Sequence, residues 1–222
     1  MKTHLLSTSP QFYARAIGLL YLVVIAAGII SQMFISGQII VNGDAATTAN
    51  NILNHKNLYQ LGFSIYLIEM ASQIAQMAIL YLLLKPASKT VSLLALSFAL
   101  TGCTIKTISR LFYIAPLIIL TNTRYLSVFS ANQLQSLALL FLELNDQAAG
   151  LALAIFGFST ILNGYLIYKS TFLPRSLGIL SFLGGLGWLT FLYPPLAHRI
   201  YPYILALGLI GGLAQIAWFL LF

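Results

Sequence analysis

Six long apolar stretches, separated by turn or charged residues, limit what this chain can fold into. Most reach or exceed the ~20 residues that a helix needs to cross the hydrocarbon core of a bilayer. Only 7% of the 222 residues are charged, whereas a soluble domain carries about a quarter, so lipid is the natural solvent. We therefore predict an all-α polytopic membrane protein, a single transmembrane domain over residues 1–222, with helices at residues 13–36, 58–84, 90–120, 147–169, 175–194 and 200–222.

The basic residues are scattered along the chain and lie mostly at the ends of the apolar stretches. This distribution argues against nucleic-acid binding despite a formal net charge of +7. One side of the membrane would carry Lys2, Arg15, Lys85, Lys89, Lys169 and Arg175, and the other side Lys56, Arg124 and Arg199. Because cytoplasmic loops carry an excess of Lys and Arg, both termini are expected in the cytoplasm.

Two longer links between spans, on the membrane side opposite to the termini, carry signals of short amphipathic helices. In "GDAATTANNILNHK", Asp44 is a suitable N-cap before Ala45. In "SANQLQSLALLFLELND", Ser130 and Gln133 fit a capping box ahead of an apolar stripe. We predict two short outer helices lying at the membrane surface or over the mouth of the bundle. A surface position without any binding role is the alternative.

An internal similarity indicates a duplication. Residues 81–98, "YLLLKPASKTVSLLALSF", align without gaps to residues 165–182, "YLIYKSTFLPRSLGILSF". Both stretches would be cytoplasmic hairpins running in the same sense, which predicts a parallel duplication of a two-helix hairpin. The charged residues inside the spans of the first copy, Glu69, Lys106 and Arg110, have the uncharged Leu153, Thr190 and Pro194 opposite them, so any site would be asymmetric.

Glycines recur at helical spacing in two of the predicted spans. Small residues let helix backbones approach closely in lipid. Packing within the bundle is the preferred interpretation, and a homo-oligomer formed through these faces is the alternative. The glycines are Gly150, Gly157 and Gly164 in the fourth span, and Gly208 and Gly212 in the sixth.

Charged residues inside the spans point to a polar site. Counted from the inner helix ends at 1.5 Å per residue, Glu69 lies ~22 Å outward, Lys106 ~24 Å, Arg110 ~30 Å and Asp146 ~34 Å. Glu69 therefore matches Lys106 in depth, and Arg110 approaches Asp146. Charges at such depth are costly, so they should face the bundle and pair or meet water.

We predict an outward-facing polar pocket that binds or passes a small solute or ion. Because positive charges are in local excess there, the solute or ion could be an anion. Its predicted residues are Glu69, Gln73, Gln76, Lys106, Arg110 and Asp146. The alternative is a non-catalytic membrane subunit or receptor in which the buried pairs are purely structural. An empty space between the charges would favour the first interpretation, and a filled one the second.

Catalysis, a cofactor and a metal site are not expected. The three histidines lie at the terminus or in loops, and the single cysteine, Cys103, gives no disulfide and no C-x-x-C pattern. A Ser–Lys pair of Ser109 with Lys106 is conceivable, but this spacing is common on helices. The expected partners are therefore lipid and a small solute.

Three stretches, in order along the chain, resemble a known family. They are "YARAIGLLYLVVIAAGI" with the later "GDAATTANNIL", then "QLQSLALLFLEL", and then "GYLIYKSTFLPRSLGIL". The sequence is similar to an uncharacterised bacterial six-span family known as domain of unknown function four-three-eight-six. The resemblance implies a multi-pass protein of the bacterial plasma membrane. It brings no known activity, so no site residue is transferred from it.

Overall fold

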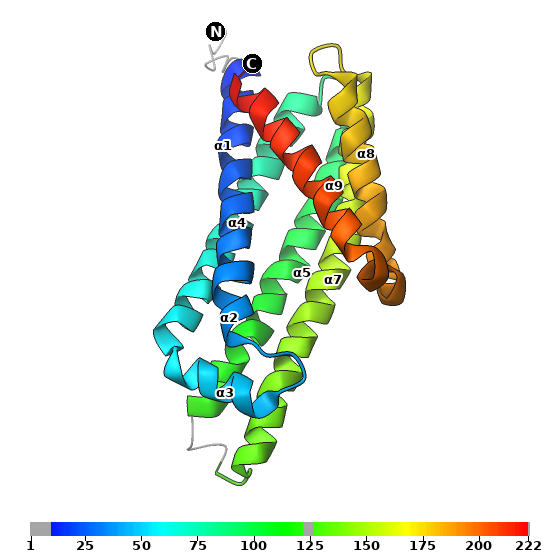
Figure 1. Cartoon of the computed structure of the whole chain (residues 1–222). Helices are drawn as coiled ribbons and strands as arrows, with labels where there is room; N and C mark the ends of the chain where they lie inside the picture. Colours follow the sequence, from blue (N-terminus) through cyan, green and yellow to red (C-terminus); the bar gives the residue numbers. More distant parts are fainter. Residues whose placement is uncertain (1–9, 122–126, 222) are drawn as a thin grey trace. The chain divides into compact units, whose positions relative to one another are not determined.

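The computed structural model describes residues 10–121 and 127–221, and within these ranges the secondary structure is helical, without strands. Figure 1 shows the path of the chain. The elements are α1 (Pro10–Ile29), the π-helix η1 (Ile30–Ser36), α2 (Gly37–Ile39), α3 (Ala45–Asn54), α4 (Lys56–Leu84), α5 (Lys89–Thr121), α7 (Ala131–Lys169), α8 (Arg175–Leu189), the 3-10 turn η2 (Thr190–Leu192) and α9 (Pro194–Leu221).

Six helical stretches are long and apolar enough to cross a membrane, which confirms the predicted all-α, six-span architecture. Their bounds are Pro10–Ile39, Lys56–Leu84, Lys89–Thr121, Ala131–Lys169, Arg175–Leu192 and Pro194–Leu221. Most of them exceed the ~20 residues that a bilayer requires, which tilt accommodates. The chain is therefore a multi-pass membrane protein.

The first predicted outer helix is present as α3. Gly43 enters it with a φ of 78°, a conformation that costs glycine little. Asp44 then caps the helix, because its Oδ1 accepts a hydrogen bond from the backbone N–H of Thr47 at 2.9 Å. The hydrogen bonds from the Thr47 N–H and from the Thr47 hydroxyl hold the pKa of the Asp44 carboxyl below its usual value.

The second predicted outer helix is not a separate element, so that part of the prediction is wrong. Residues 131–144 form the beginning of α7, which runs unbroken for 39 residues (Figure 1). Asn145 and Asp146 indicated a boundary, but the segment contains no proline to break the helix. The capping box is nevertheless formed: the Ser130 N–H donates to Gln133 Oε1 at 2.8 Å.

The chain divides into two compact units. Unit 1 comprises Met1–Val23, Ser72–Gly102 and Leu153–Phe222, and unit 2 comprises Val24–Ala71 and Cys103–Ala152. Helices α1, α4, α5 and α7 contribute residues to both. The single transmembrane domain stays a prediction, and so does the duplication of the hairpin.

Glycines allow a close backbone contact in unit 1, between the end of α7 and α8. A Cβ atom at Gly164 would lie 2.8 Å from the carbonyl oxygen of Gly178, and one at Gly178 would lie 2.7 Å from that of Gly164. Gly157 and Gly185 form a second reciprocal pair, at 3.0 and 2.9 Å. The predicted use of the glycine stripe for packing within the bundle is confirmed for Gly157 and Gly164.

Apolar side chains and one polar contact complete unit 1. The core contains Ile17, Leu80, Leu83, Leu84, Leu166, Ile167, Leu173, Leu177 and Phe219. Helices α8 and α9 pack against each other (Figure 1). The Gln215 amide on α9 donates to Ser181 Oγ on α8 at 2.7 Å, the kind of polar contact that holds helices together in lipid.

Unit 2 has a core of a different composition, with three buried tyrosines. Tyr59, Tyr66 and Tyr113 join Ile35, Ile39, Ile52, Leu117 and Leu142. The ring of Tyr59 stacks on Tyr113 with centroids 4.5 Å apart, and its hydroxyl donates to the Tyr113 carbonyl oxygen. Because phenols need hydrogen-bond partners when buried, this core brings polar groups into the unit.

Candidate functional site

Helix periodicity places Glu69 of α4 and Lys106 and Arg110 of α5 on the sides of the two helices that face each other. On α4, Tyr66 and Glu69 are three residues apart, and on α5, Lys106 and Arg110 are four apart, so each pair shares one helix face. A third helix, α7, contributes Asn145. We call Glu69, Lys106, Arg110, Tyr66 and Asn145 the charged cluster.

The two helices are joined by an ion pair. Lys106 Nζ donates to Glu69 Oε1 at 2.7 Å, with the side chains 16% and 5% exposed respectively. It is the pair that equal depth along α4 and α5 predicts, and the structure confirms it. Breaking such a buried pair by removing one partner costs about 3–5 kcal/mol, because a buried charge is left uncompensated.

Arg110 is 4% exposed and is held by neutral groups. Its guanidinium carbon lies 3.8 Å from the centroid of the Tyr66 ring, and its NH1 group donates to Asn145 Oδ1 at 3.1 Å. The Asn145 amide in turn donates to Asp146 Oδ1 at 2.9 Å. Arg110 and Asp146 therefore approach each other, as their depths predict, but they do not pair directly, since Asn145 lies between Arg110 and the exposed Asp146.

The π-helix η1 adds polar groups that sequence reasoning missed. Tyr66 donates to Gln32 Oε1 at 2.6 Å, and Ser36 Oγ lies 3.2 Å from the Tyr66 hydroxyl. Ser36 also donates to the Tyr113 hydroxyl at 3.2 Å. The sequence signal was the pair of polar residues Gln32 and Ser36 in an apolar span, but a π-helix departs from the 3.6-residue period on which face assignments rest.

Two atoms of the charged cluster are buried without a hydrogen-bond partner. They are Oε2 of Glu69 and Nε of Arg110. Buried polar atoms are normally satisfied, and each exception costs about 1–3 kcal/mol. An unpartnered acceptor and an unpartnered donor in one cluster are therefore the unusual features of this unit.

The predicted residues Gln73 and Gln76 lie farther along α4, in unit 1. Gln76 is 3% exposed and its Oε1 has no partner. The structure thus brings together Glu69, Lys106 and Arg110, and reaches Asp146 through Asn145. For Gln73 and Gln76 a role in solute binding stays a prediction.

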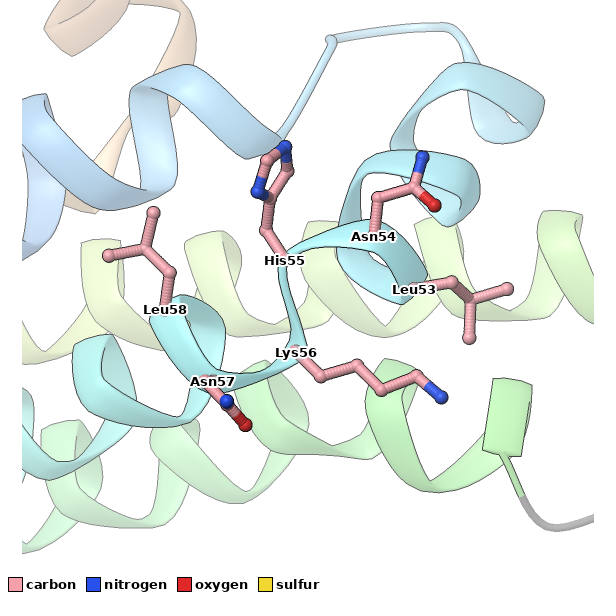
Figure 2. Close-up of a pocket in the computed structure, with 6 residues that line it drawn as sticks. All are labelled: Leu53, Asn54, His55, Lys56, Asn57 and Leu58. Carbon is pink, nitrogen blue, oxygen red and sulfur yellow. The ribbon is translucent and has the colours of Figure 1, made fainter.

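Two hollows are found in the described part of the chain, and no residue of the charged cluster lines either of them. One, of about 450 Å³, is at the junction of α3 and α4 and is lined by Leu53, Asn54, His55, Lys56, Asn57 and Leu58. Figure 2 shows these six consecutive side chains spreading in different directions, not converging on one point. The other, of about 200 Å³ in unit 1, is lined mainly by apolar groups, Trp218 and Leu83 among them. Neither contains a residue of the predicted site.

Metal binding finds no support in residues 10–121 and 127–221. No group of three or more His, Cys, Asp and Glu side chains in these ranges could hold a metal ion. The charged cluster itself offers ionic and hydrogen-bonding groups, those of Lys106, Arg110 and Glu69.

Comparisons with known proteins identify the family alone. No curated protein and no solved structure matches the chain. The family described as domain of unknown function (DUF4386) matches residues 16–222, which covers all six membrane-spanning helices except the first residues of α1. The chain therefore belongs to the DUF4386 family of membrane proteins.

Proposed function

We propose that this chain binds or passes a small solute that carries an acid group, with the charged cluster of unit 2 as the binding site. The carrying observation is the state of Arg110. Its guanidinium is buried, its Nε has no partner, and among the described residues the ion pair found is that of Lys106 with Glu69. Arg110 is thus a buried cation with no carboxylate in direct contact, since Asn145 lies between it and Asp146.

The chemistry of guanidinium supports an acid as the ligand. Arg presents a planar set of donors that matches a carboxylate with two parallel hydrogen bonds. In Arg110, NH1 is engaged by the neutral Asn145, while Nε is unengaged. The Tyr66 ring on one face fixes the plane of the group, so Arg110 would orient the acid while Lys106 adds a second positive charge.

The cost of the arrangement also favours function. Burying a cation without an ionised partner is costly, because the charge loses its water. The chain contains four acidic side chains, and all four, Asp44, Glu69, Glu143 and Asp146, belong to unit 2. A purely structural Arg110 would be expected to use one of them directly, which it does not.

The second candidate function is that of a membrane subunit or receptor whose buried charges only stabilise the fold. It is favoured by the direct 2.7 Å contact between Lys106 and Glu69 and by the position of both described hollows elsewhere. In this case the partners would be other membrane proteins or a second copy of this chain. They would meet at glycine-lined helix faces that are not engaged in packing within unit 1.

The test compares binding of acetate, propionate and butyrate by the protein in lipid nanodiscs, measured by calorimetry. Arg110→Lys keeps the positive charge and removes Nε, and we expect at least a tenfold loss of affinity. Arg199→Met is the control, because Arg199 is an exposed arginine on α9. Folded Arg110→Lys protein that binds these acids as tightly as the wild type would contradict the proposal, as would wild-type protein that binds none of them.

The proposal includes the bacterial plasma membrane as the location, with both termini in the cytoplasm. Of the cations that support this orientation, Arg15, Lys85, Lys89, Lys169 and Arg175 are described, against Lys56 and Arg199 on the opposite side. Lys2 and Arg124 lie outside the described residues. Reporter fusions at the C-terminus test the orientation: a cytoplasm-active fluorescent protein should be active there, and a phosphatase that needs export should not.

A further inference from the structure

The unpartnered oxygen of Glu69 is a second recognition element in the charged cluster. Glu69 is 4% exposed, and its Oε1 already accepts the Lys106 ammonium. The other oxygen, Oε2, is buried without a partner. An ionised carboxylate is an acceptor only, with about four lone-pair sites, so Oε2 can be satisfied only by an N–H or O–H donor.

The neighbouring first span leaves room beside this carboxylate. The residue of α1 that faces Glu69 is Gly28, and a Cβ atom built there would lie 3.8 Å from Glu69 Oε1 and 3.9 Å from Cδ. These are ordinary van der Waals distances, so a side chain as large as alanine would fit at this position without displacing Glu69. The glycine therefore leaves room for about one methyl group beside the carboxylate, on the side of the oxygen Oε1 that Lys106 occupies.

The residues that carry the unpartnered acceptor and the unpartnered donor belong to neighbouring turns of α4 and α5. Arg110 stacks on Tyr66, which is three residues from Glu69 along α4, a rise of ~4.5 Å. On α5, Arg110 is four residues from Lys106, a rise of ~6 Å. A ligand that satisfies both atoms must carry an acid group and a donor, and this spacing of the two residues favours a small molecule.

We infer that the solute is a small amino acid-like zwitterion, whose carboxylate meets Arg110 Nε while its ammonium meets Glu69 Oε2. This inference rests on the proposed function and names its ligand class. The charges are complementary at both ends of the ligand: its carboxylate meets the cations Arg110 and Lys106, and its ammonium meets the carboxylate of Glu69. A dicarboxylate would instead set its second carboxylate against Glu69, and like charges repel.

The test uses two homologous series on the same protein in nanodiscs. Glycine, β-alanine and 4-aminobutyrate are compared by calorimetry with acetate, propionate and butyrate, and succinate is added as the dicarboxylate. In the wild type, we expect one of the amino acids to bind at least tenfold more tightly than the acid of equal length, and succinate to bind more weakly than 4-aminobutyrate.

Glu69→Gln separates the two recognition elements. It removes the negative charge, so the preference for the amino acid over the matched acid should fall to within about threefold, while binding of the plain acid persists. If the variant does not fold, the wild-type comparison of the three amino acids with their acids of equal length still decides the question.

The possible failures are distinguishable. Acids that bind in an Arg110-dependent way but gain nothing from an amino group would overturn this inference and leave the proposed function standing. The absence of any Arg110-dependent acid binding would overturn both.

Discussion

Replacing Gly178 with alanine should weaken the protein by forcing apart the helices that it joins in unit 1. A Cβ atom at this position would lie 2.6 Å from the backbone nitrogen of Tyr168 and 2.7 Å from the carbonyl oxygen of Gly164. Both are backbone atoms, which cannot rotate away as a side chain can. The end of α7 and α8 would have to separate by several tenths of an ångström to restore normal contact.

A matched control on the same helix isolates the loss of unfolding free energy that the clash causes. At Gly184 a Cβ atom would meet nothing within 4 Å, so Gly184→Ala changes helix propensity without a clash. Both substitutions carry the same gain in propensity, about 0.8–1 kcal/mol in water, which cancels when the two are compared. The remaining difference is the cost of overpacking, for which we expect the upper end of the usual range, about 3 kcal/mol.

The single cysteine offers an assay of this difference. Cys103 is buried, so a thiol-reactive fluorophore labels it when the protein unfolds on heating. A difference of about 3 kcal/mol corresponds to roughly 6–12 °C in Tm for a chain of this size, with Gly178→Ala the less stable variant. Equal melting temperatures for the two alanine variants would refute the close-contact argument.

Three further predictions concern unit 2. In a double-mutant cycle of Glu69→Gln and Lys106→Met, each single change should cost about 3–5 kcal/mol and the double change clearly less than their sum, because neither charge is then left alone; additive losses in the thermal assay would contradict the ion pair. Tyr66→Phe should cost about 1 kcal/mol of unfolding free energy by removing the hydrogen bond to Gln32, whereas a Tm equal to that of the wild type would show that the bond contributes nothing. The pKa of Asp44 is lowered on folding, so its cap stabilises α3 above the ordinary carboxyl pKa and is lost as the pH falls through the lowered value; hydrogen exchange of α3 should therefore accelerate at low pH in the wild type, and be already fast and less pH-dependent in Asp44→Ala.

The site was partly accessible from sequence because helix rise is constant. Counting residues along two spans matched Glu69 with Lys106 in depth, and that pair is formed. The same counting paired Arg110 with Asp146, where the structure inserts Asn145. Depth along a helix is a one-dimensional property, but the choice between adjacent residues depends on the rotation of each helix about its axis, which no residue count provides.

By itself the sequence determined the solvent, the number of spans and the cap of α3, because apolar length and local hydrogen-bonding groups act without distant partners. Only the tertiary structure decided that α7 continues through Asn145, and that η1 brings Gln32 and Ser36 to Tyr66. It also decided which atoms of Glu69 and Arg110 stay unpartnered. The physical reason is that satisfaction of a buried polar atom depends on the few ångströms around it, where side chains distant in sequence meet.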